Sequence, residues 1–281
     1  MTQAPTATRH RRPLIAGNWK MYKTREEGLH FLEALASAAV SGQWPAAEFL
    51  PELALFVPFT LLEALHKKAS ELKAPLSVAI GAQNMESRVE GALTGEISPR
   101  MLEDVGVSWV LIGHSERRQY YNETDATVNA KLLAAYAHEM QPILCVGETL
   151  AQREAGGTDA LVAEQTQKAT QGLSPEQALS LVIAYEPVWA IGTGKVCDAD
   201  EANRVCGVIR QQLASLYDES LAAQVRILYG GSVKPDNSAE LLAQPEIDGA
   251  LIGGASLDPA SYLTIVQATS AKPATLNACS L

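Results

Sequence analysis

Short runs of apolar residues recur along this chain, and segments with helical spacing of apolar residues alternate with them. The runs that read as strands lie at residues 14–16, 53–57, 76–81, 109–113, 143–146, 181–184, 226–228 and 250–252. Strands that are apolar on both faces and alternate with helices predict a parallel sheet, because crossover helices cover both faces. Eight strand–helix units favour an α/β fold of one domain, a closed (β/α)8 barrel, over an open sheet.

The predicted helices carry the signals that normally mark where a helix begins. They include residues 24–40, 60–72, 125–139, 198–216 and 238–242. Thr24 is followed by Glu27, and Asp198 by Glu201. At this spacing a side chain can accept a hydrogen bond from the unpaired N–H groups of the first turn. No linker or shift in composition divides the chain, which supports a single domain.

Composition and net charge argue against several classes of protein. The chain has 281 residues, of which 47% are hydrophobic and 19% charged, so a large core is available and global disorder is not expected. A net charge of −10 argues against nucleic acid or an anionic membrane as a partner. Cys145, Cys197, Cys206 and Cys279 form no CxxC pair, so neither a disulfide framework nor a metal site is indicated. We expect a cytoplasmic protein without cofactors.

Both ends of the chain differ from the expected barrel at residues 13–270. Residues 1–12 are polar, end in a basic cluster and lack the apolar core of a secretory signal. We expect a disordered basic tail there, with a fragment of an organelle-targeting segment as the alternative. Residues 271–281 read as a second loose tail.

In such barrels the chemistry lies just after the C-terminal ends of the strands. The segments expected there include Gly17-Asn18-Trp19-Lys20, Gly113-His114-Ser115-Glu116-Arg117-Arg118, Tyr229-Gly230-Gly231-Ser232 and Gly253-Gly254-Ala255-Ser256. The two glycine-rich turns can bring backbone N–H groups close to an anion, and phosphate sites often follow strands seven and eight. Tight turns without a ligand are the alternative for these glycines.

The segment after the sixth strand combines an acid with a glycine-bearing loop. Glu186 emerges from an apolar strand, and Pro187 ends that strand. Gly192 and Gly194 follow an apolar tip at Ala190 and Ile191, which suits a mobile lid that closes and excludes water. A surface turn with an unrelated acid is the alternative.

Several long segments, in this order, resemble the signature segments of the triosephosphate isomerase family, and the likeness runs from about residue 14 to residue 266. They are Asn18-Trp19-Lys20, Gly113-His114-Ser115-Glu116-Arg117-Arg118, Tyr185-Glu186-Pro187-Val188-Trp189-Ala190-Ile191-Gly192-Thr193-Gly194 and Tyr229-Gly230-Gly231-Ser232. The resemblance implies a TIM barrel and an aldose–ketose isomerase of glycolysis and gluconeogenesis. It would interconvert dihydroxyacetone phosphate and D-glyceraldehyde 3-phosphate. An isomerase of a tetrulose phosphate and a non-catalytic phosphate-binding barrel are the alternatives.

The resemblance also implies roles for individual residues. Glu186 would move the proton, while a neutral His114 and Lys20 would stabilise the enediolate oxygens. Glu116 would support Lys20 and His114, although an ordinary acid in the first turn of a helix is the alternative. The implied substrate-binding residues are Asn18, Lys20, Gly192, Ser232, Gly253 and Gly254.

A homodimer is the last implication of the resemblance. The segment at residues 83–96 follows the third strand and is too long for a plain βα turn. In the family this loop docks into a second subunit. Thr94 would approach the partner's Asn18 and Lys20, and Glu96 would pair with the partner's Arg117.

Overall fold

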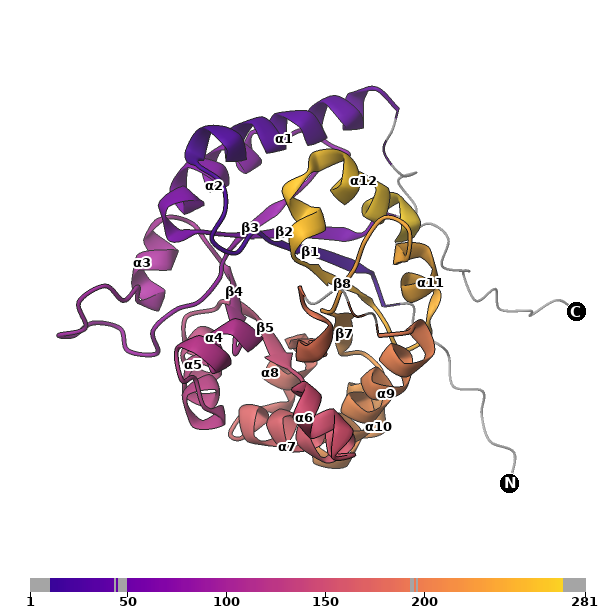
Figure 1. The fold of residues 1–281 in the computed structure, drawn as a ribbon. Coiled ribbons are helices and arrows are strands. Elements are labelled where there is room, and N and C mark those ends of the chain that lie inside the picture. The colour runs from indigo at the N-terminus through magenta and orange to yellow at the C-terminus, as the bar shows by residue number, and fades with distance from the viewer. Residues whose placement is uncertain (1–10, 43, 45–49, 193–194, 196, 270–281) are drawn as a thin grey trace, which may run out of the picture.

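The protein is an eight-stranded parallel barrel surrounded by helices (Figure 1). The computed structural model describes residues 11–42, 44, 50–192, 195 and 197–269. The strands are β1 Leu14–Asn18, β2 Glu52–Val57, β3 Ala79–Ala82, β4 Trp109–Ile112, β5 Gln141–Val146, β6 Val182–Tyr185, β7 Arg226–Tyr229 and β8 Gly249–Ile252. Each strand pairs in parallel with the next, and β8 pairs with β1, so the ring closes. The predicted (β/α)8 barrel is confirmed.

Helices follow the strands around the outside of the ring. The α-helices are α1 Arg25–Val40, α2 Leu62–Ser70, α3 Pro99–Asp104, α4 Ser115–Tyr120, α5 Asp125–Ala137, α6 Leu150–Glu154, α7 Thr158–Thr170, α8 Pro175–Ser180, α9 Ala199–Leu216, α10 Glu219–Ala222, α11 Ser238–Ala243 and α12 Pro259–Ala268. The short 3₁₀ helices are η2 Phe59–Leu61, η3 Val188–Ala190 and η4 Gly254–Leu257. In the part of the chain that the structure describes, no helix is both long and apolar enough to cross a membrane.

The uninterrupted apolar runs of the strands follow from burial on both faces. Along β1, Leu14 and Ala16 belong to the cluster that fills the inside of the barrel. Ile15 belongs to the larger cluster between the strands and the helices. Because neither face of a strand meets water, the period-two alternation of a half-buried sheet is lost.

The predicted helix starts are confirmed where the structure tests them. Thr24 and Glu27 form a reciprocal capping box at the start of α1, and Asp198 accepts a hydrogen bond from the N–H of Glu201 at 2.7 Å. The third strand was predicted too early, at residues 76–81. Leu76 is buried but closes a turn, because its N–H donates to the carbonyl of Lys73.

Candidate active site

A cavity of about 330 Å³ opens at the C-terminal end of the barrel. It brings together residues that are predicted to act in catalysis or substrate binding, namely Asn18, Lys20, His114, Glu186, Gly192, Ser232, Gly253 and Gly254. These residues follow five different strands, so the closed ring is what gathers them. The cavity is also lined by Tyr22, Lys234, Leu251 and Leu257. No motif in the sequence predicted that these residues lie there.

The end of β1 is fixed by Gln83, which directly follows β3. The Nε2 group of Gln83 donates to Oδ1 of Asn18 at 3.1 Å and to the carbonyls of Lys20 and Phe56 at 2.8 and 3.1 Å. The N–H of Lys20 also donates to Oδ1 of Asn18, at 3.0 Å. Because two donors already occupy this oxygen, Asn18 can offer a ligand its NH₂ group as a donor.

Lys20 brings a cation into the cavity lining beside Glu116. Its backbone has a φ of 51°, a left-handed conformation that is rare for residues other than glycine. Its Nζ lies 2.5 Å from Oε1 of Glu116, and its Cε is close to the position where a side chain at Gly253 would begin. Lys20 therefore bridges the acid at the start of α4 and the glycine turn after β8.

His114 stands at the N-terminus of α4, and its two ring nitrogens have different partners. Nδ1 accepts the N–H of Glu116 at 3.2 Å, and Nε2 lies 3.0 Å from Oε1 of Glu186. Both contacts are satisfied together by the neutral ring with its proton on Nε2, because a proton on Nδ1 would face the N–H of Glu116. Burial lowers the pKa of His114 and the charge of Glu186 raises it, with a net increase in this arrangement.

Glu186 is buried at the end of β6, and both of its carboxylate oxygens have polar partners. Its Oε1 contacts His114, and its Oε2 accepts the N–H of Ser115 at 2.8 Å. Burial raises the pKa of Glu186, but His114 and the N–H of Ser115 together lower it by more. The carboxylate is therefore kept charged while it rests against His114.

Two glycines make room for Glu186, and sequence reasoning did not predict this role. A Cβ at Gly147 would lie 1.8 Å from the carbonyl oxygen of Glu186, and a Cβ at Gly230 would lie 2.9 Å from its Cγ. No real Cβ tolerates such contacts, so any larger residue would displace the carboxylate. The requirement depends on β5 and β7 flanking β6, which the local sequence does not encode.

Glycine turns also line the cavity. Gly254 and Gly192 have no heavy atom within 4 Å of the position that a Cβ would take, and Gly192 has a φ of 68°. Gly254 begins η4, and Ser232 follows the pair of glycines after β7. Open backbone beside Lys20 suits an anion that needs several N–H donors.

The predicted lid begins at η3, directly after Pro187. The indole Nε1 of Trp189 donates to Oε1 of Glu148 at 2.8 Å, and Ile191 and Gly192 line the cavity. Thr193 and Gly194, also assigned to the lid, lie outside the described residues.

The residues assigned to a dimer interface lie outside this cavity. Glu96 and Arg117 line a separate groove of about 510 Å³. Within the chain, Nε of Arg117 pairs with Oε1 of Glu123 at 2.6 Å, and its guanidinium lies 4.8 Å from the ring centroid of Tyr121. Thr94 lies in the segment between β3 and α3.

Comparison with known proteins gives the same family along nearly the whole chain. A sequence model described as triosephosphate isomerase matches residues 13–269. The triosephosphate isomerase of Moorella thermoacetica is 52% identical over 256 residues, which cover 91% of this chain and 98% of that protein. That of Carboxydothermus hydrogenoformans is 50% identical over 259 residues, which cover 92% and 98%.

Proposed function

Because this chain belongs to the triosephosphate isomerase family, we propose that it interconverts dihydroxyacetone phosphate and D-glyceraldehyde 3-phosphate through an enediolate. The reaction is an aldose–ketose isomerisation of glycolysis and gluconeogenesis. The observation that carries the proposal is the 3.0 Å contact between Glu186 and His114 in a cavity that also holds Lys20 and the glycine turns. A base, a neutral donor, a cation and an anion site are what this reaction needs.

The substrate phosphate binds against the glycine turns. Backbone N–H groups at Gly192, Ser232, Gly253 and Gly254 supply donors, and Lys20 supplies charge. The NH₂ group of Asn18 donates to a substrate oxygen. These contacts persist through the reaction, so they orient the three-carbon unit between His114 and Glu186.

Glu186 removes the proton from the carbon that carries the hydroxyl group. Its contact with His114 is what lowers its pKa in the ligand-free arrangement. When a substrate separates the two side chains, that effect weakens while burial still raises the pKa, so the carboxylate becomes a stronger base. Glu186 then returns the proton to the neighbouring carbon.

His114 and Lys20 stabilise the negative charge that develops on the substrate oxygens. The proton on Nε2 of His114 points to the side of the ring where Glu186 now rests, and a substrate oxygen there receives the same hydrogen bond. Lys20 contributes a full positive charge from the cavity lining. Glu116 holds Nζ of Lys20 at 2.5 Å.

The proposal is tested by product analysis with purified protein. Dihydroxyacetone phosphate in deuterium oxide should give glyceraldehyde 3-phosphate with deuterium at the carbon that receives the proton. A tetrulose phosphate should turn over at least tenfold more slowly, as kcat/KM. Preference for the longer sugar would shift the assignment to that substrate, and phosphate binding without turnover would show a non-catalytic barrel.

We also propose that the chain forms a homodimer through the loops after β1 to β4. Exposed apolar side chains follow each of these neighbouring strands, namely Met21, Tyr22, Phe59, Val89, Met101, Tyr120 and Tyr121. Figure 1 shows the segment between β3 and α3 projecting from the barrel. A projecting loop beside an apolar surface supports docking into a second copy.

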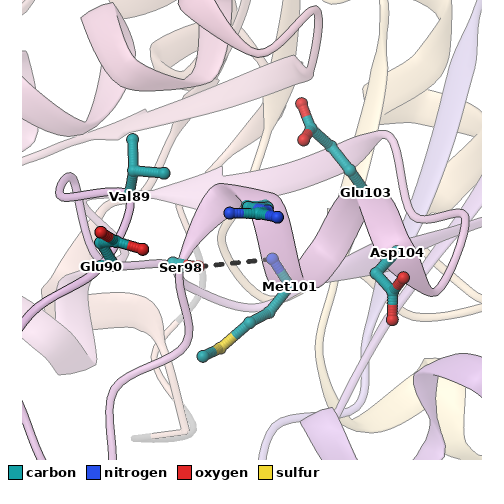
Figure 2. A pocket seen from close by; sticks show the side chains of 7 residues that line it. Val89, Glu90, Ser98, Met101, Glu103 and Asp104 are labelled. Atoms are coloured by element: carbon teal, nitrogen blue, oxygen red, sulfur yellow. Dashed lines mark hydrogen bonds between the residues drawn. The ribbon is translucent and has the colours of Figure 1, made fainter.

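A groove of about 590 Å³ at the base of this projecting segment supports the same assembly (Figure 2). Val89 and Met101 line it together with Glu90, Glu103 and Asp104. Apolar and charged side chains therefore line the same groove, as they do at many surfaces that a partner covers. Shortening residues 88–94 should give monomers with weak activity in sedimentation and rate measurements, and a fully active native monomer would contradict the homodimer.

A reducing cytoplasm suits this role. A glycolytic reaction takes place there, and Cys145, Cys197 and Cys206 are free and buried in the described part of the chain.

A further inference from the structure

We propose that Arg153 is a positioning residue for the isomerisation: it fixes the buried carboxylate of Glu148 and the indole of Trp189, and through them the backbone that carries Glu186. Arg153 lies on α6, outside the substrate cavity. The inference rests on the proposed function, since it takes Glu186 as the base.

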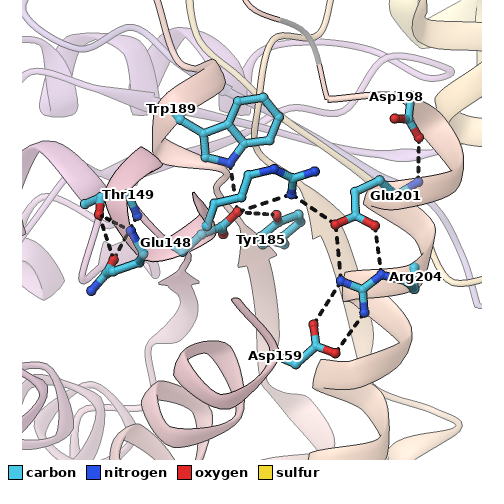
Figure 3. Close-up of polar contacts among 10 residues, drawn as sticks. Glu148, Thr149, Asp159, Tyr185, Trp189, Asp198, Glu201 and Arg204 are labelled. Carbon is cyan, nitrogen blue, oxygen red and sulfur yellow. Dashed lines mark hydrogen bonds and ion pairs between the residues drawn. The ribbon is translucent and has the colours of Figure 1, made fainter. Parts of the chain in front are cut away.

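Glu148 is a fully buried carboxylate at the end of β5 (Figure 3). Its Oε1 accepts hydrogen bonds from the hydroxyl of Tyr185 at 3.1 Å and from the indole of Trp189 at 2.8 Å. Its Oε2 has no hydrogen-bond partner among the described residues. Two neutral donors on one oxygen do not by themselves compensate the burial of a full negative charge.

Arg153 supplies the opposite charge. Its Nη1 lies 3.8 Å from Oε1 of Glu148, and its guanidinium lies 4.5 Å from the ring centroid of Trp189. The same Nη1 pairs with Oε1 of Glu201 at 3.0 Å. Arg153 therefore contacts both partners of the Glu148–Trp189 hydrogen bond and is itself anchored to α9.

Further ion pairs continue from Glu201 to Arg204 and Asp159, and they restrain the position of the guanidinium. Glu201 also pairs with Arg204 at 2.8 Å, and Arg204 pairs with Asp159 on α7 at 2.9 Å (Figure 3). Glu201 is held at the start of α9 by its capping bond to Asp198. The chain of charges thus connects α7 and α9 to the residues just after the catalytic base.

Backbone hydrogen bonds transmit this position to Glu186. The N–H of Val188 donates to the carbonyl of Glu148 at 3.0 Å, and the N–H of Glu186 donates to the carbonyl of Val146 at 2.7 Å. Glu148 therefore holds the segment after Glu186 twice, by its backbone and by its carboxylate. If Arg153 is removed, the uncompensated carboxylate relaxes, Trp189 loses both contacts, and the carboxylate of Glu186 is displaced.

The expected effect is on turnover rather than on substrate binding. Small displacements of a base lower the rate strongly, and about 1 Å can cost a hundredfold. Three of the four proposed phosphate donors, Ser232, Gly253 and Gly254, come from the loops after β7 and β8, and only Gly192 follows the segment that Arg153 holds. We expect Arg153→Met to lower kcat about tenfold, with KM within about twofold of the wild-type value.

The experiment compares three variants. Arg153→Met keeps an apolar stem of similar length but removes the charge and the planar group. Arg153→Lys restores the charge without the planar group and should recover part of kcat. Arg204→Met is the matched control, because it makes the same change one ion pair further from Glu148 and should leave kcat within about twofold.

Two further measurements distinguish a loss of positioning at Trp189 and Glu186 from a general loss of native structure. The inhibition constant of inorganic phosphate should be unchanged in all three variants. In protein labelled with 5-fluorotryptophan, the ¹⁹F resonance of Trp189, assigned by replacing Trp189, should shift in Arg153→Met and not in Arg204→Met. If Arg153→Met does not fold, Arg153→Lys carries the same two measurements with a smaller expected loss.

Several outcomes would overturn the inference. These are a kcat within twofold of wild type for Arg153→Met, an equal loss in Arg204→Met, a rise in KM at constant kcat, or an unmoved Trp189 resonance. The proposed function fails separately, if the wild-type protein does not isomerise triose phosphates or if Glu186→Gln retains full activity. The fluorine measurement needs no turnover, so it tests the Arg153 contact in either case.

Discussion

Two buried carboxylates stand at opposite ends of the barrel. Asp248 lies before β8, where Arg11 and Arg210 contact it at 2.6 and 2.9 Å and the N–H of Ile227 donates to it at 3.0 Å. Glu186 lies after β6, and its carboxylate oxygens contact His114 and accept the N–H of Ser115. Both side chains are nearly inaccessible to water, at 1% and 2% exposure, so burial does not distinguish them.

The partners decide what each carboxylate can do. Two guanidinium groups and an N–H hold Asp248 in one state, and these contacts tie the N-terminal segment and α9 to β8. A neutral histidine can exchange a carboxylate for a substrate oxygen, so Glu186 can leave its resting position. A buried acid with cationic partners on both oxygens stabilises the fold, whereas one with a replaceable partner can act as a base.

The largest expected difference between the two sites is in turnover. Glu186→Gln should lower kcat by roughly 10³-fold, because the base is lost while the phosphate donors remain. The thermal unfolding midpoint should change little. Steady-state kinetics and calorimetry on the same preparation check both values, and near-native turnover would show that Glu186 is not the base.

The same carboxylate-to-amide change at Asp248 should have the opposite profile. Asp248→Asn leaves Arg11 and Arg210 without their charged partner and should lower the free energy of unfolding by about 3 kcal/mol. Turnover of the folded protein should stay within about twofold. Denaturant unfolding at fixed protein concentration measures the loss of unfolding free energy. A drop in kcat without loss of stability would contradict the distinction between the two carboxylates.

Lys20 tests whether a cation at the catalytic end acts on substrate. Lys20→Ala should lower kcat/KM by about 10²-fold or more through both constants, because one charge serves the phosphate and the enediolate. Lys67, on the surface of α2, offers a matched control that should leave the kinetics unchanged. Normal kinetics for Lys20→Ala would show that Lys20 pairs with Glu116 but does not act on the substrate.

The smallest expected effect concerns Glu123, an acid with fixed partners like those of Asp248. Burial raises its pKa, but Lys131 and Arg117 lower it by more. The lowered pKa in the folded state adds stability above the ordinary pKa of about 4.3, and this stability is lost as the pH falls below that value. Between pH 6 and 3, Glu123→Gln should lose less stability than wild type in denaturant titrations, and equal losses would contradict the assignment.

Local sequence predicted the elements well because burial on both faces leaves a continuous apolar run. The exception is instructive. Leu76 and Val78 are buried as a strand would be, yet β3 begins only at Ala79. Apolar character indicates that a residue is buried, but it does not indicate whether the residue is hydrogen-bonded to a neighbouring strand.

The sequence also predicted those residues of the catalytic end that belong to a recognisable motif. Asn18, Lys20, His114 and Glu186 were named from segments at strand ends, and the structure gathers all four in one cavity. Gln83 was not named, although it fixes the end of β1 through three hydrogen bonds. Its role depends on β1, β2 and β3 lying side by side.

The sequence by itself determined the alternation of strands and helices and which chemical groups follow each strand, because these depend on neighbours within a few positions. Only the tertiary structure decided which buried acid is fixed and which can move. Arg11 reaches Asp248 across 237 residues, and Ser115 reaches Glu186 across 71. The state of a buried charge depends on the groups within a few ångströms of it, and the closing of the ring, not the order of the chain, selects those groups.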